Sequence, residues 1–105
     1  MLKLSHLLLS FVILNFSFSI NYIEEIQPIF NASCISCHNS GSSNYNDHQL
    51  DLSSYSELML GGESGNIVIP FDADSSILWQ KINLGDMPPY GSGSDPLATE
   101  QINLI

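Results

Sequence analysis

The chain has 105 residues, and eleven Asp and Glu against two Lys and Arg give it a formal net charge of −9. This length accommodates one domain. Nucleic acids and anionic membrane surfaces are bound by clustered Lys and Arg, so the composition excludes both as partners.

Residues 1–19 have the pattern of a secretory signal peptide, a positive start followed by an apolar run. Lys3 supplies the charge and residues 7–20 supply the run, which only Ser and Asn interrupt. Small side chains at Ser17 and Ser19 predict cleavage after Ser19. The alternative is an uncleaved anchor, although the run is shorter than the roughly 20 apolar residues that span a bilayer. We therefore expect a domain over residues 20–105, exported to the periplasm or the outer face of the cytoplasmic membrane.

Residues 20–105 contain a single Lys, Lys81, and all eleven acids, so the net charge after cleavage is −10. The acids either keep a small protein soluble or form a docking surface for a basic partner. A domain of this size usually needs disulfides, a metal or another bound group for stability. Two cysteines allow at most one disulfide, so we expect a different stabilising group.

The predicted elements of the first half are one helix and a polar loop. Apolar residues at 23, 26 and 30 have helical spacing and predict a helix over residues 22–30. Pro28 predicts a kink or a late start of this helix. Residues 39–48 (NSGSSNYNDH) are polar and aperiodic, which predicts a loop.

A second helix and an extended segment follow. Ser54 and Glu57 have the spacing of a capping box, which predicts a short helix that ends at residues 61–62 (GG). Residues 67–69 (IVI) predict a brief strand or extended segment, closed by Pro70.

Two further helices complete the chain. Asp72 and Asp74 are candidate N-caps for the first of them, and the last begins near Pro96 or Thr99. Between them, residues 85–95 (GDMPPYGSGSD) predict a Gly- and Pro-rich loop. Loops of about ten residues in so small a domain are usually functional. We therefore interpret the chain as short helices and long loops around a large ligand.

Residues 34–38 (CISCH) form the C-x-x-C-H attachment signature of c-type haem. The spacing allows Cys34 and Cys37 to bond covalently to the two vinyl groups of one porphyrin. His38 then faces the iron, which binds a neutral imidazole strongly. Haem c would supply the missing stabilising group, and we expect Phe30, Phe71, Trp79 and the tyrosines to pack in its pocket.

Other interpretations of the motif use the same residues without haem, and they include a small-loop disulfide between Cys34 and Cys37 and simple coincidence. A redox-active thiol pair would need a strand–helix context that is missing here. A zinc site needs four ligands, which Cys34, Cys37, His38 and His48 could formally supply.

The sixth iron ligand has three candidates. Met87 lies in a loop that two prolines stiffen, Met59 lies in the predicted helix before the glycine pair, and His48 follows the polar loop. We favour Met87 as the distal ligand, because a helical Met is more often core packing. An open sixth position is the remaining alternative.

An ordered series of motifs resembles the planctomycete-type cytochrome c domain. The resemblance implies a small all-α, class-I-like cytochrome c fold around one covalent haem, with His38 as the proximal and Met87 as the distal ligand. In that family the domain occurs alone or as a module of larger exported proteins. The segments that carry the resemblance are residues 26–30 (IQPIF), 34–38 (CISCH), 50–55 (LDLSSY), 58–62 (LMLGG), 67–70 (IVIP), 74–78 (DSSIL) and 87–89 (MPP).

The C-terminal helix departs from the family pattern. Family members continue beyond the equivalent of residues 102–105 (INLI) into a fuller helix that crosses the N-terminal one. We expect a truncated helix here, and we favour the interpretation that the chain is a fragment of a longer protein.

These observations predict a single-haem electron carrier that cycles between Fe(II) and Fe(III), and not an enzyme. The partner would be a redox protein, with a basic docking surface if the acids form the contact. The alternatives are a haem-binding module of a larger exported protein and a peroxidase-like haem enzyme, which would need an open sixth position and His48 as its acid–base group.

Overall fold

The computed structural model describes residues 19–105, which are helical and contain no strand. The prediction of an all-α chain of short helices is therefore confirmed, while the predicted signal peptide lies outside the described residues except for Ser19. None of the helices in the described part is long and apolar enough to cross a membrane. In order, they are η1 (Tyr22–Ile26), α1 (Gln27–Ser33), α2 (Tyr45–His48), α3 (Tyr55–Leu60), α4 (Ile77–Asn83) and α5 (Thr99–Leu104).

The N-terminal helix begins as one π-helical segment, η1, and continues as α1. The Asn21 side chain caps it by accepting hydrogen bonds from the backbone N–H groups of Ile23 and Glu24, at 3.1 and 3.3 Å. Pro28 lies in the first turn of α1, directly after η1, and its ring fixes φ near the helical value. The predicted late start at Pro28 was wrong, since the helix begins at Tyr22; the change from π-helix to α-helix occurs at Gln27 instead.

The predicted short helix after Ser54 is confirmed as α3, with Ser54 as its N-cap. Ser54 Oγ accepts a hydrogen bond from the backbone N–H of Glu57 at 3.2 Å. The helix ends at Leu60, and Gly61 follows with a φ of +74°, a conformation that glycine adopts without penalty.

Two local predictions were wrong. The segment predicted as a loop contains α2, and α4 follows Ser76 without a cap from Asp72 or Asp74. The Asp72 carboxylate instead accepts a hydrogen bond from the Ser75 backbone N–H at 3.2 Å. This hydrogen bond closes a turn that ends just before α4.

Residues 67–69 are extended, as the alternative prediction allowed, but they pair with no strand. The buried Ser76 hydroxyl accepts a hydrogen bond from the Ile69 N–H at 2.8 Å and donates one to the Asp72 carbonyl at 2.8 Å. The Leu78 N–H donates to the Ile67 carbonyl at 3.1 Å. The start of α4 therefore satisfies the polar groups that a neighbouring strand would have bonded.

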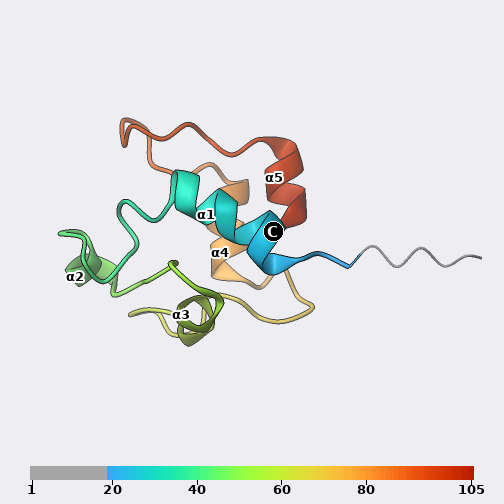
Figure 1. Cartoon of the computed structure of the whole chain (residues 1–105), viewed down its shortest axis with the longest axis horizontal. Coiled ribbons are helices and arrows are strands. Elements are labelled where there is room, and N and C mark those ends of the chain that lie inside the picture. The colour runs from blue at the N-terminus through green and yellow to red at the C-terminus, as the bar shows by residue number, and fades with distance from the viewer. Residues whose placement is uncertain (1–18) are drawn as a thin grey trace, which may run out of the picture.

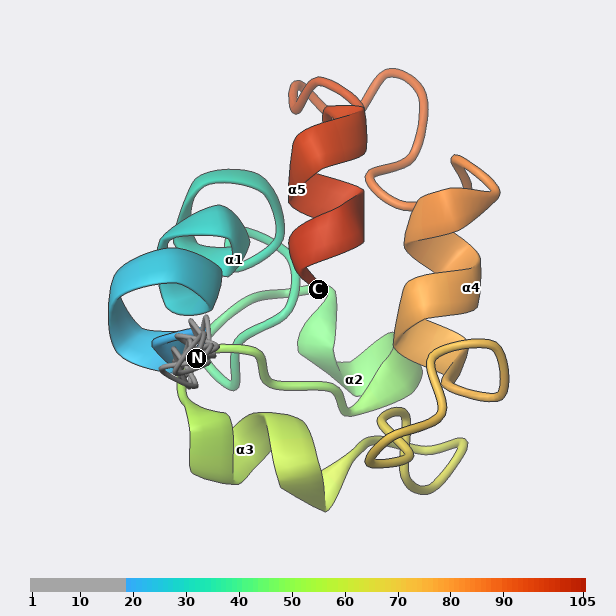
Figure 2. The same ribbon diagram turned by 90° about the vertical axis from the view of Figure 1, so that its right-hand side faces the viewer.

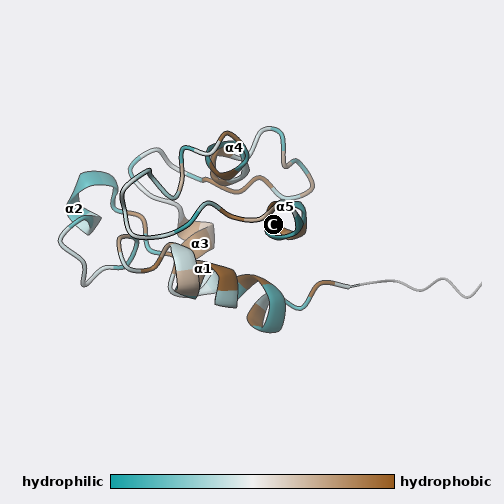
Figure 3. Cartoon of the chain, turned by 90° about the horizontal axis from the view of Figure 1, so that it is seen from above, coloured by the Kyte–Doolittle hydropathy of each residue, from teal (hydrophilic) through white to brown (hydrophobic). Residues whose placement is uncertain are grey.

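Two apolar clusters form the core. The first consists of Ile26, Phe30, Leu52, Leu58 and Ile67, and the second of Ile29, Ile82 and Leu97. Leu78, Leu104 and Ile105 pack against both clusters, so the end of α5 joins the N-terminal helix to α4. Figure 1 shows α1, α4 and α5 near one another, with α2 at the end away from α5, and Figure 2 shows α5 between α1 and α4. Apolar colouring lies along α1, α3 and α4, whereas α2 is hydrophilic (Figure 3).

Candidate functional site

The C-x-x-C-H segment forms a tight turn directly after α1. The N–H groups of Cys34 and Ile35 both donate to the Phe30 carbonyl at 2.9 Å. The N–H groups of Cys37 and His38 both donate to the Cys34 carbonyl, at 3.2 and 3.0 Å. This backbone pattern fixes both cysteines and the histidine relative to the buried Phe30.

A second segment, residues 51–53, holds this turn from the other side. The His38 carbonyl accepts a hydrogen bond from the Leu52 N–H at 2.9 Å. The buried Asp51 carboxylate accepts hydrogen bonds from the N–H groups of Ser40 at 3.1 Å and Ser53 at 2.8 Å. Burial alone would raise the pKa of Asp51, but these hydrogen bonds outweigh it and place the pKa below its ordinary value. Asp51 is therefore an ionised clasp between the two segments.

The Met87 loop is anchored to the end of α4. The Lys81 carbonyl accepts hydrogen bonds from the N–H groups of Asp86 at 3.0 Å and Met87 at 3.2 Å. Gly85 makes the turn with a φ of +75°, and Pro88 is buried behind the methionine. The backbone of Met87 is thus held by a helix whose core residue is the buried Ile82.

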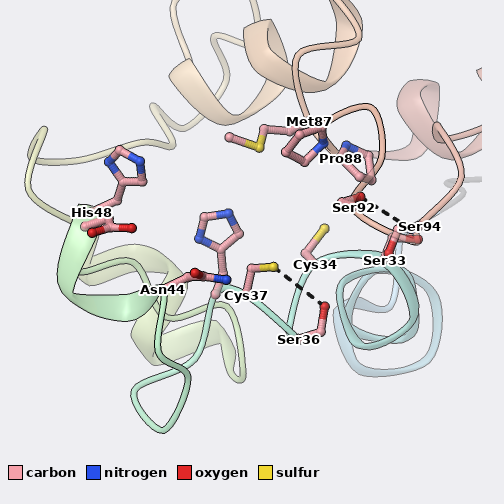
Figure 4. Close-up of a pocket in the computed structure, with 13 residues that line it drawn as sticks. Ser33, Cys34, Ser36, Cys37, Asn44, His48, Met87, Pro88, Ser92 and Ser94 are labelled. Atoms are coloured by element: carbon pink, nitrogen blue, oxygen red, sulfur yellow. Dashed lines mark hydrogen bonds between the residues drawn. The ribbon is translucent and has the colours of Figure 1, made fainter.

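Two adjoining cavities, of about 200 and 400 Å³, lie between these segments. Cys34, His38, His48 and Met87 border both of them, whereas Cys37 borders only the smaller one. Figure 4 shows the side chains of Cys34 and Cys37 on one side of the smaller cavity and Met87 reaching in from the opposite side. The structure thus brings together all four predicted haem-site residues around one space.

Apart from the residues they share, different side chains line the two cavities. Ser33, Ser92 and Ser94 contribute hydroxyl groups to the smaller cavity. The larger cavity has an apolar wall that includes two buried core residues, and its apolar members are Leu50, Leu52, Ile67, Ile77 and Leu78.

Two ionisable groups of the site, Cys34 and His38, are held in their neutral forms. Burial, and secondarily the neighbouring Cys37, raise the pKa of the Cys34 thiol to about 11. Burial, and secondarily the nearby His48, lower the pKa of His38. A neutral imidazole has a free lone pair for a metal ion, while a raised thiol pKa is the opposite of what a reactive redox cysteine needs. Both cysteines are free thiols, without a disulfide.

The other candidate ligands are placed less favourably than Met87. Met59 borders neither cavity and packs against the cluster around Phe30, as predicted for a core methionine. His48 borders both cavities but is exposed to solvent. No group of three or more His, Cys, Asp or Glu within residues 19–105 could hold a metal ion, so the zinc interpretation lacks a ligand set there.

The prediction that aromatic side chains pack in this pocket was wrong. Among residues 19–105, no Phe, Tyr or Trp borders either cavity. Phe30 is fully buried in the first cluster, Phe71 and Tyr90 are fully exposed, and Trp79 borders a separate cavity. The aliphatic wall described above occupies the place that the aromatic residues were expected to take.

Sequence reasoning also missed two polar residues that hold the site, Asp51 and Gln27. The buried Gln27 side chain donates hydrogen bonds to the Leu52 carbonyl and to Asn31 Oδ1, both at 2.9 Å, and accepts one from Tyr22 at 2.8 Å. A signal existed for both residues. Asp51 lies between two leucines, and Gln27 falls on the apolar face of its helix.

The sequence model of one protein family, described as Planctomycete cytochrome C, matches residues 34–91. This match covers more than half of the chain and contains Cys34, Cys37, His38 and Met87. No curated protein and no solved structure matches the chain. The chain belongs to the planctomycete cytochrome C family.

Proposed function

We propose that the protein is a single-haem c-type cytochrome that carries electrons outside the cytoplasmic membrane. The observation that carries the proposal is the joint placement of two cysteines, a neutral histidine and a methionine around adjoining cavities. Membership of the cytochrome c family supports a covalently bound haem c and an electron-transfer role rather than catalysis.

The residues present fit such a group. Cys34 and Cys37 would hold it through thioether bonds, His38 would bind its iron on one side and Met87 on the other. The apolar wall of the larger cavity suits a flat hydrophobic ring, and the thioether of Met87 favours the ferrous state. When bound, the haem supplies reversible exchange of one electron, taken from a reduced partner and given to an oxidised one. The chain's own part is to hold the ligands in place by the backbone hydrogen bonds described above, so that little moves during transfer.

The partner we propose is a redox protein with a basic docking surface. Residues 19–105 carry eleven Asp and Glu and one Lys, and complementary charge increases the rate of encounter. A second candidate function, a peroxidase-like haem enzyme, is favoured only by the position of His48 on both cavities. It requires that Met87 leave the sixth position open.

The test is the visible spectrum of protein produced with a c-type haem maturation system, oxidised and reduced, native and denatured. Haem that stays attached after denaturation, with a thioether-to-iron charge-transfer band, supports the proposal. Met87→Ala is expected to abolish the band, whereas Met59→Ala, which removes a methionine outside both cavities, is the matched control and retains it. A protein without covalent haem would refute the proposed cytochrome function. A charge-transfer band that persists in Met87→Ala would refute the assignment of Met87 as the distal iron ligand.

A further inference from the structure

Lys81 is the only Lys or Arg among residues 19–105, and it is one of the residues that border the larger cavity. It lies in the last turn of α4, four residues before Gly85, at which the Met87 loop turns. The residues that border the two cavities indicate a role for this positive charge.

The two cavities correspond to two different edges of a haem. Cys37 borders only the smaller cavity and Cys34 borders both, so the thioether edge would lie toward the smaller cavity, while His38 and Met87, the proposed iron ligands, border both. A haem carries its two carboxylates on the edge opposite its vinyl groups. The carboxylate edge therefore belongs to the larger cavity.

Glu63 and Lys81 are the charged residues that border the larger cavity without bordering the smaller one. Glu63 repels a carboxylate, whereas the Lys81 ammonium attracts it. The present partner of Lys81 is Asp86, with Nζ 3.5 Å from Oδ2 and both side chains about half exposed, at 52% and 54%. An exposed ion pair of this kind contributes little free energy, so the ammonium can turn to a stronger partner.

We propose that Lys81 binds a haem carboxylate in the larger cavity and thereby favours the reduced iron. The inference rests on the proposed function and adds to it a cofactor-positioning residue. A positive charge near the iron destabilises the ferric state, which carries one more positive charge than the ferrous state. Removal of the charge is expected to decrease the equilibrium constant for reduction on the order of tenfold, equivalent to a drop of about 59 mV in the one-electron potential.

The experiment compares the reduction potential of the haem-loaded wild type with four variants at low and high salt. Lys81→Gln removes the charge, and Lys81→Arg retains it. Asp86→Asn breaks the ion pair but leaves the ammonium in place. Asn103→Asp changes the net charge by the same single unit on an exposed residue of α5 that borders neither cavity.

We expect the potential to fall in Lys81→Gln alone, by more at low salt than at high salt, and to stay near the wild-type value in Lys81→Arg. An unchanged potential in Lys81→Gln would overturn the inference. An equal fall in Asp86→Asn would overturn it too, since the ion pair would then act through the Met87 loop. An equal fall in Asn103→Asp would reduce the effect to net charge and overturn it as well. A wild type that binds no haem would refute the proposed function itself, which is a separate outcome.

Discussion

The Asp51 clasp gives the most direct test of how the candidate site is held together. Asp51 is 8% exposed, and its carboxylate accepts two backbone hydrogen bonds, one from each of the segments that it joins. Hydrogen bonds to a charged group contribute about 1.5–3 kcal/mol each. Asp51→Ala loses both and is expected to reduce the free energy of unfolding by about 4 kcal/mol, whereas Asp51→Asn keeps one acceptor oxygen and loses about 2 kcal/mol.

The same carboxylate predicts a direction for the pH dependence of stability. Because the pKa of Asp51 in the folded protein lies below its ordinary value of 3.8, the charged form is bound more strongly in the folded chain. Its stabilisation is fully present above the ordinary pKa and is lost as the pH falls through the lowered one. Asp51→Asn therefore lowers the free energy of unfolding near neutral pH. The difference in this free energy between the variant and the wild type decreases as the pH falls into the acid range.

Urea unfolding of the haem-loaded protein, followed by far-UV circular dichroism between pH 3 and 7, measures both effects. Asp72→Asn is the matched control, since this exposed carboxylate accepts a single hydrogen bond within its own turn. Its expected effect is within about 0.5 kcal/mol. Equal losses in the two variants, or an Asp51→Asn deficit that stays constant down to pH 3, would refute the clasp.

Further predictions concern glycine and phenylalanine positions, each measured by urea unfolding. Gly85→Ala is expected to cost about 1 kcal/mol, because the residue has a φ of +75° but a Cβ there meets no atom within 4 Å. Gly61→Ala is expected to cost more than about 3 kcal/mol, because its Cβ would clash with the Gly65 carbonyl group. Similar costs for the two would contradict this reasoning. Phe30→Ala removes a fully buried side chain and is expected to reduce the free energy of unfolding by about 3–5 kcal/mol. Phe71→Ala removes a fully exposed side chain and is expected to reduce it by less than about 0.5 kcal/mol. A larger loss in Phe71→Ala than in Phe30→Ala would contradict the described core.

Local features of the fold were predictable because their causes lie within a few residues. Ser54 caps α3 through a side chain three residues from the bonded N–H, and Gly61 ends the helix through its own backbone freedom. The C-x-x-C-H spacing and the Pro-flanked Met87 likewise predicted which side chains surround the cavities. Whether the chain continues past residue 105, and whether residues 1–19 are removed, remain predictions.

Features that depend on distant partners were not predictable in the same way. The Ser76 hydroxyl, rather than a second strand, bonds the Ile69 backbone across seven residues. Gln27 meets the Leu52 carbonyl across 25 residues. Neither contact follows from a fixed spacing in the sequence, because each depends on how a loop folds back against a helix. The prediction that aromatic side chains line the haem pocket failed for a related reason. The size of an aromatic ring favours its burial, but it does not determine which surface the ring packs against.

The wall of the larger cavity explains why a chain with so little regular structure can present an organised site. Leu52 and Ile67 belong to the first core cluster and also border this cavity. One face of these side chains thus packs against Phe30 while another faces the space between His38 and Met87. Three sets of hydrogen bonds hold the backbone that carries Leu52. The His38 carbonyl accepts from the Leu52 N–H, the Gln27 side chain donates to the Leu52 carbonyl, and the Asp51 carboxylate accepts from the N–H groups of Ser40 and Ser53. A flat apolar group in the cavity would therefore extend the existing core rather than require a new one, which is the physical reason that one short segment can serve both stability and cofactor binding.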